Sequence, residues 1–192
     1  MVKDIALQIV KKIEDTISEI DENEAKAFIN EVIHSRNIFV VGAGRSGLVA
    51  RAFAMRLMHL GLNVYVIGET ITPPIRPGDL LIAISGSGET LSTLTAAQTA
   101  KKLGARIAVV TSFTDSPLAK IADCIVRIKG RVKARREDYQ VRQLMGEHEP
   151  LTPLGTLFEL STLVFLDSVI TRLMQIFNKR EIDLIRRHAN IE

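Results

Sequence analysis

The chain has few of the residues on which several classes of protein depend. It holds one cysteine, Cys124, among 192 residues, so no disulfide can form within it. That cysteine has no second cysteine or histidine at metal-ligand spacing, so the sequence offers no zinc site, and we expect neither a metal nor another cofactor. A chain of this kind suits a reducing compartment, and we expect a cytoplasmic location.

Aromatic residues and long apolar runs are also scarce. Tryptophan is absent and aromatic residues make up 5% of the chain, which leaves few platforms for stacking nucleic-acid bases. The 25 basic and 22 acidic residues are interleaved, and the formal net charge is only +3. No run approaches the ~18 apolar residues that span a bilayer, and the first residues open a charged amphipathic pattern instead of a signal peptide. We therefore expect neither nucleic acid nor membrane as a partner.

Hydrophobic residues, in contrast, make up 46% of the chain, enough for one substantial core. We predict a single domain over residues 1–192. Its expected parts are N-terminal helices over 1–35, a sheet core over 37–127, a long loop over 130–152 and C-terminal helices over 153–192.

Short β-branched runs alternate with helical patterns in the central part of the chain. The segments 46–60 and 89–103 have helical periodicity, and each ends at a glycine, Gly61 or Gly104. The apolar runs between them are nearly continuous, which is typical of strands covered on both faces. This alternation predicts an α/β fold with a parallel sheet. The five expected strands are 38–41, 63–66, 80–84, 106–110 and 124–126.

Helical patterns also flank the sheet core. Over residues 3–35 isoleucines recur at three- and four-residue spacing, with an acidic break at Asp21 and Glu22. This apolar stripe either faces the core or packs against a second copy of the chain. A last long helix is expected from Pro153 to Phe177, followed by a charged helical tail from Lys179.

The segment Ser85-Gly86-Ser87-Gly88-Glu89-Thr90 follows an apolar strand and opens a helix. The first N–H groups of a helix lack partners, and its dipole favours an anion. Glycines let the main chain approach such an anion, while the hydroxyls of Ser85, Ser87 and Thr90 add hydrogen bonds. The pattern favours a site for a phosphate monoester, although a serine-rich turn with a helix cap would also explain it.

A second glycine loop follows the first expected strand, with glycines at positions 42, 44 and 47. The spacing G-x-G-x-x-G of a dinucleotide site is met. The acidic residue that would bind a ribose comes late, at Glu69, so a nucleotide is possible but disfavoured. A sugar phosphate needs only one phosphate pocket and nearby polar groups.

Together, Gly42-Ala43-Gly44-Arg45-Ser46 and Ile84-Ser85-Gly86-Ser87-Gly88-Glu89-Thr90 resemble the sugar isomerase (SIS) domain over residues 37–178. The resemblance implies a three-layer αβα sandwich with a five-stranded parallel sheet in flavodoxin-like order and helical extensions at both ends. It also implies that a sugar phosphate is bound by Ser46, Ser85, Ser87 and Thr90, with Gly44, Gly86 and Gly88 in the loops. Gly86 departs from the glutamine of the isomerase half of glucosamine-6-phosphate synthase, which removes one possible side-chain contact.

Three further segments, 68–73, 153–159 and 187–192, are similar to one branch of that family. The resemblance implies an intramolecular oxidoreductase that interconverts D-arabino-hex-3-ulose 6-phosphate and D-fructose 6-phosphate. Such enzymes serve formaldehyde assimilation in the ribulose monophosphate pathway, need no metal and form homotetramers. Two alternatives remain: an aldose–ketose isomerase, for example of arabinose 5-phosphate, and a phosphosugar-binding regulatory module.

Moving a ketone to the neighbouring carbon requires a base that takes up and returns a proton through an enediolate. A carboxylate partly buried beside a ligand suits both halves of that transfer. Glu159 is the candidate, since it lies between apolar residues at the start of the last long helix. A carboxylate that only favours the helix dipole is the alternative.

His188 lies in the charged tail and is the second catalytic candidate, because an imidazole can move protons among substrate oxygens. A chain end most readily reaches a site on a neighbouring subunit, so we expect active sites shared within an oligomer; an exposed histidine without a role is the alternative. Arg45 and Arg51 are weaker candidates for supporting the phosphate or the enediolate.

The other histidines and the basic loop carry weaker signals. His34 and His59 fall near expected helix ends and are interpreted as surface or capping groups. His148 lies in the expected long loop and either closes over substrate or is solvated. The basic residues that either steer an anion inward or form a solvated face are Arg131, Lys133, Arg135 and Arg136.

Overall fold

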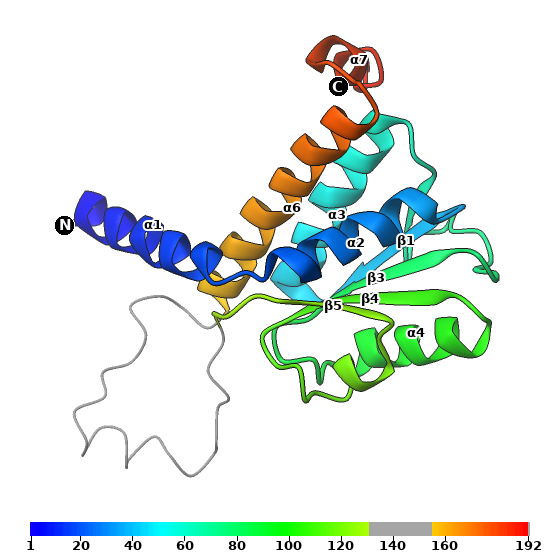
Figure 1. Cartoon of the computed structure of the whole chain (residues 1–192), viewed down its shortest axis with the longest axis horizontal. Coiled ribbons are helices and arrows are strands. Elements are labelled where there is room, and N and C mark those ends of the chain that lie inside the picture. The colour runs from blue at the N-terminus through cyan, green and yellow to red at the C-terminus, as the bar shows by residue number, and fades with distance from the viewer. Residues whose placement is uncertain (131–154, 192) are drawn as a thin grey trace.

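The computed structural model describes residues 1–130 and 155–191, and five parallel strands form its centre (Figure 1). Their order across the sheet is β2-β1-β3-β4-β5, the flavodoxin-like order. The predicted α/β class with a five-stranded parallel sheet is therefore confirmed. The strands are β1 (Ile38–Gly42), β2 (Val64–Val66), β3 (Leu80–Ile84), β4 (Arg106–Thr111) and β5 (Cys124–Arg127).

Helices cover both faces of the sheet and make it the middle of three layers (Figure 1). Alternate strand residues point to opposite faces, so Val40 joins one apolar cluster and Phe39 the other. The first cluster contains α2 (Glu22–His34), α3 (Gly44–Leu60) and α6 (Thr156–Ile176). The second contains α4 (Leu91–Lys102) and a 3₁₀ turn, η1 (Ala119–Ile121).

Local caps fix the ends of the helices, and they explain where the predicted bounds hold or shift. The Asp21 carboxylate accepts the Asn23 and Glu24 N–H groups, which separates α1 (Val2–Ser18) from α2 at the predicted acidic break. Gly61 ends α3 in the left-handed conformation, as predicted.

Several predicted helix bounds differ from the structure. The helix expected over 46–60 begins at Gly44, and the one expected from Pro153 begins at Thr156, after its N-cap Gly155. Because Thr90 is extended, α4 begins at Leu91 and not at residue 89. The predicted helical tail shortens to α7 (Glu181–Ile185), after which the chain makes turns. Most of the predicted loop over 130–152 lies outside the described residues.

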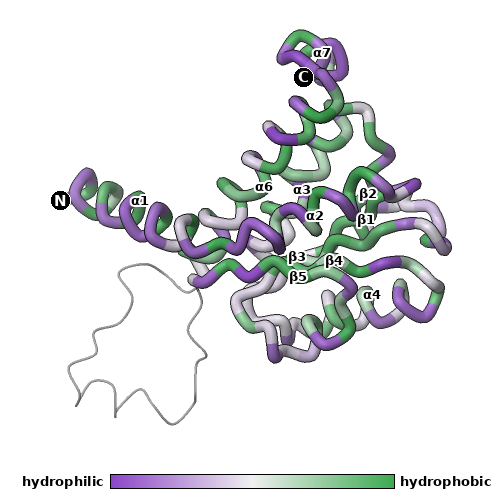
Figure 2. Tube along the Cα trace, in the orientation of Figure 1, coloured by the Kyte–Doolittle hydropathy of each residue, from purple (hydrophilic) through white to green (hydrophobic). Residues whose placement is uncertain are grey.

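The first helix, α1, extends away from the sheet, and apolar residues alternate with polar ones along it (Figures 1 and 2). Ile5, Leu7 and Val10 have exposed fractions of 47%, 58% and 60%. The expected apolar stripe is thus only partly covered, through Ile17 and Ile20, by the core. Among the described residues, no helix has the length and apolar character to cross a membrane.

Three phenylalanines join the helices that cover the first face of the sheet. The Phe28 ring of α2 lies 6.2 Å from the Phe53 ring of α3 and 5.8 Å from the Phe165 ring of α6, between ring centroids. All three side chains are buried, and Phe28 has no exposed surface. This cluster holds α3 and α6 side by side, and both helices lead to the site described below.

We expect Phe28→Ala to lower the free energy of unfolding by about 3–5 kcal/mol, because it removes a buried ring and leaves a cavity between three helices. Urea denaturation followed by circular dichroism measures this loss. Leu103→Ala, at a half-exposed position, is the matched control and should change the value by less than about 1 kcal/mol. A Phe28→Ala loss no larger than that of the control would contradict the assigned role.

Candidate functional site

Two loops leave neighbouring strands at the carboxyl edge of the sheet and begin side by side. Gly42 of β1 pairs with Ile84 of β3, so the loops that start at Ala43 and Ser85 are adjacent. This is the point at which the strand order reverses, where open α/β sheets bind ligands. Both loops lead into helices, α3 and α4, whose N-caps have no side-chain hydrogen bond to their first turns. The N–H groups at the starts of both helices therefore lack a capping side chain, which suits the binding of an anion.

The first loop is a tight strand-to-helix turn. A Cβ atom on Gly42 would lie 2.8 Å from the Ser46 carbonyl oxygen, and one on Gly47 would lie 2.8 Å from the Gly42 carbonyl oxygen. Close packing of β1 on the start of α3 therefore explains these two glycines without a dinucleotide. Glu69, the late acidic residue, forms an ion pair with Arg51.

The second loop is held in shape by its own hydroxyl groups. The Gly88 N–H donates to Ser85 Oγ at 3.2 Å, and Ser85 Oγ donates to Thr90 Oγ1 at 3.3 Å. The Glu89 N–H donates to Ser87 Oγ at 3.3 Å. These hydrogen bonds make the segment a serine-rich turn, which was the alternative interpretation of its sequence. They also hold the three predicted hydroxyls together at the start of α4.

Glu159 is brought to this edge by α6. It lies in the first turn of α6, and its side chain, 12% exposed, forms an ion pair with Arg45 Nε. Arg45 directly precedes Ser46 in the first turn of α3. Two candidates predicted from distant parts of the sequence, Arg45 and Glu159, are therefore in contact. Beside them is a largely apolar hollow of about 200 Å³ between α3 and α6, with Leu48 and Leu163 in its wall.

His188 lies at the other end of α3. Its ring is 5.1 Å from that of His59, between centroids, and His59 is in the last turn of the helix. A rise of about 1.5 Å per residue separates Ser46 from His59 by about 20 Å along the axis. The structure therefore does not bring His188 to the loops of its own chain.

His59 lies near the end of its helix, as expected, but it is not a surface group. Its side chain is buried, with 3% exposed, because the C-terminal turns that carry Arg187 and His188 cover the end of α3. The helical period alone could not reveal this covering segment. His34 is exposed, as interpreted, and its Nδ1 is hydrogen-bonded to the Asn30 carbonyl oxygen.

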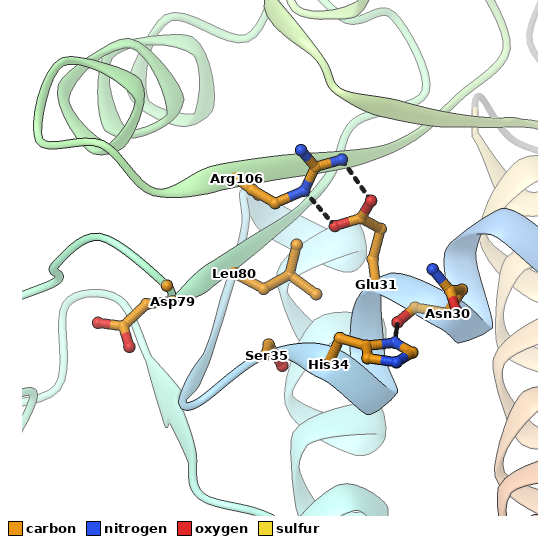
Figure 3. A pocket seen from close by; sticks show the side chains of 8 residues that line it. Asn30, Glu31, His34, Ser35, Asp79, Leu80 and Arg106 are labelled. Carbon is orange, nitrogen blue, oxygen red and sulfur yellow. Dashed lines mark hydrogen bonds and ion pairs between the residues drawn. The ribbon is translucent and has the colours of Figure 1, made fainter.

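A second cavity, of about 330 Å³, lies at the opposite edge of the sheet, between the end of α2 and the starts of β3 and β4 (Figure 3). Arg106 and Glu31 pair across its wall through two hydrogen bonds. Asp79 points away from it and accepts hydrogen bonds from Arg36 and Asn37. These polar groups are paired with one another, and the cavity lies far from the convergent helix starts.

Sequence reasoning missed two residues of the site. Ser116 packs against Gly88, where an added Cβ would overlap the Ser116 side chain. Gly155, the N-cap of α6, has a φ of +89° and lies against the Glu159 carboxylate. A glycine just before a helix was the available signal for the second.

His148 and the four basic loop residues lie outside the described residues. Within those that are described, no three His, Cys, Asp or Glu side chains are grouped to hold a metal ion.

We expect Gly88→Ala to abolish the stabilisation of the protein by inorganic phosphate, because the new methyl group overlaps Ser116 and displaces the serine loop. Thermal denaturation with and without phosphate measures the effect. Adding Ser116→Gly removes the overlapping atoms and should restore part of the shift, the left-handed φ of residue 88 remaining as a strain. Unchanged stabilisation in Gly88→Ala would contradict a role for this loop in anion binding.

The chain is similar in sequence to a known family and to several known proteins. The SIS domain model matches residues 31–144. An uncharacterized protein of Aeropyrum pernix is 50% identical, covering 98% of this chain and 90% of its own. The 3-hexulose-6-phosphate isomerase of Bacillus subtilis is 39% identical over 96% of both chains.

A solved structure supports the same relationship. A Methanococcus jannaschii protein, whose structure was described as inferring a molecular function of 3-hexulose-6-phosphate isomerase, is 35% identical over 98% of both chains, with a TM-score of 0.78. The resemblance predicted from the two loops is confirmed: the chain belongs to the SIS domain family.

Proposed function

We propose that this protein is a 6-phospho-3-hexuloisomerase, which interconverts D-arabino-hex-3-ulose 6-phosphate and D-fructose 6-phosphate. The observation that carries the proposal is the position of Glu159, a largely buried carboxylate that forms an ion pair with Arg45 in the first turn of α3. Relatives of nearly the same length that are named 3-hexulose-6-phosphate isomerase support the choice of substrate. The reaction would supply fructose 6-phosphate in formaldehyde assimilation through the ribulose monophosphate pathway.

The substrate phosphate would be bound where α3 and α4 begin. The hydroxyls of Ser46, Ser85, Ser87 and Thr90 supply donors, and the uncapped N–H groups of both helices add main-chain donors. Gly44, Gly86 and Gly88 carry no side chain that would keep an anion from the main chain. This arrangement leaves the sugar to extend toward the start of α6.

The isomerisation moves one hydrogen between neighbouring carbons. Glu159 takes the proton from C2 of the 3-ketose, and the electron pair of the C2–H bond forms the enediolate double bond while the negative charge goes to the C3 oxygen. A proton then passes from the C2 hydroxyl to the C3 oxygen, and Glu159 returns its proton to C3. A partly buried carboxylate beside an apolar hollow suits this shuttle, because apolar walls limit the contact of the reacting carbons with water once the sugar is bound.

A second copy of the chain would complete the site. Leu48, in the wall of the hollow, is 66% exposed, and α1 presents further uncovered apolar residues. Surfaces of this kind mark interfaces between chains. Since His188 is distant from its own loops, we propose that it serves the site of a neighbour in a homotetramer.

We expect purified protein to form fructose 6-phosphate in the presence of a chelator when a hexulose-phosphate synthase makes the 3-ketose from ribulose 5-phosphate and formaldehyde. Glu159→Gln should lower kcat at least about 100-fold, since the amide cannot accept the carbon-bound proton. Binding without turnover by the unmodified protein would favour a regulatory module. Turnover of arabinose 5-phosphate in place of the hexulose phosphate would favour an aldose–ketose isomerase.

Mixing two inactive variants tests whether sites are shared. Glu159→Gln and His188→Ala should each be inactive alone, whereas co-expressed subunits should regain activity. In a random equal mixture about a quarter of the sites would combine an intact Glu159 with an intact His188 from the neighbouring subunit. Activity of the mixture no greater than that of its parents, or full activity of His188→Ala alone, would contradict a shared site.

A further inference from the structure

The Glu159 carboxylate is bounded on two sides, by Arg45 and by Gly155. On one side, Arg45 donates from Nε to Glu159 Oε2. On the other, a Cβ on Gly155 would lie 2.8 Å from Glu159 Oε1. One oxygen thus accepts a hydrogen bond from a guanidinium, and the other occupies the space that a Cβ on residue 155 would enter.

We propose that Arg45 and Gly155 are positioning residues that set the orientation of the Glu159 carboxylate, an inference that rests on the proposed function. The two act on different oxygens of the same group. Arg45 attracts Oε2 toward the start of α3, and the missing side chain of residue 155 lets Oε1 lie back against the first turn of α6. A carboxylate held in this way can present a constant face to the reacting carbons.

The different burial of Arg45 and Glu159 supports a role of Arg45 in orienting the carboxylate, in addition to the attraction between their charges. The Arg45 side chain is 58% exposed, while that of Glu159 is 12% exposed. The arginine therefore reaches from an exposed position to a largely buried carboxylate in the first turn of α6. Gly155 adds a second constraint, since its φ of +89° disfavours a side chain and an added Cβ would push the Glu159 carboxylate from its position.

The chain contains a matched pair for comparison at the opposite edge of the sheet. Arg106 and Glu31 form an ion pair with side-chain exposures of 55% and 15%, nearly the same as those of Arg45 and Glu159 (Figure 3). Gly78, beside that pair, has a φ of +86°, and an added Cβ there would meet nothing within 4 Å. Arg106→Gln and Gly78→Ala therefore repeat the loss of an ion pair and the backbone strain away from the site.

The first test is the kinetics of Arg45→Gln with hexulose 6-phosphate. We expect kcat to fall by about 10- to 100-fold with KM changed less than about threefold, because orientation of the base is lost while phosphate binding remains. Arg45→Lys should recover part of kcat, and Arg106→Gln should retain it. In the Glu159→Gln background, Arg45→Gln should cost little more, since the group it positions is already disabled.

The second test concerns the glycine. Gly155→Ala and Gly78→Ala should lower Tm to a similar extent, because both force alanine into a left-handed backbone. Only Gly155→Ala should also lower kcat by about tenfold or more, by displacing the carboxylate from Arg45.

The outcomes separate this inference from the function on which it rests. A raised KM at constant kcat in Arg45→Gln, or losses of Arg45→Gln and Glu159→Gln that multiply, would overturn the positioning role and leave the base in place. Equal kcat in the two alanine variants would overturn the role of Gly155. Near-normal turnover of Glu159→Gln would instead remove the base itself.

Discussion

The parallel pairing of β1 with β3 is the constraint on which the rest of the site depends. These strands are neighbours in space although β2 lies between them in the chain, so the loops that follow them open side by side. Each loop must then turn directly into a helix that covers one face of the sheet. The two helices leave the sheet on opposite faces, α3 on one and α4 on the other, and only their starts can converge. The closeness of those starts is thus a product of topology before any side chain contributes.

The sequence was most informative where local chemistry and topology agree. Apolar runs located all five strands within a residue or so, and Gly61 marked the end of α3, because these signals act over a few neighbouring residues. The two loops were found from glycine and hydroxyl spacing at the ends of strands. Their adjacency then followed from the flavodoxin-like order that the resemblance implied.

What the sequence could not predict depends on contacts between distant segments. The pairing of Arg45 with Glu159 joins residues 114 positions apart, and no local pattern encodes it. The burial of His59 depends likewise on a C-terminal segment whose own composition is that of a solvated surface. Such contacts are set by how helices pack on a finished sheet, so side-chain roles at their ends became visible only in three dimensions.

The proposed binding of phosphate by main-chain groups has a consequence for how such a site can diversify. Under the proposed function, many of the hydrogen bonds to the phosphate come from main-chain N–H groups at the starts of α3 and α4. Any residue other than proline at these positions retains that N–H group. Under the same proposal, the sugar would be contacted by α6, which comes from a different part of the chain and carries Glu159. Substitutions in α6 would then change which sugar is bound without removing the N–H groups at the helix starts. Recognition of the phosphate and recognition of the sugar would therefore lie on separate elements of the fold, so that the second could change while the first stays constant.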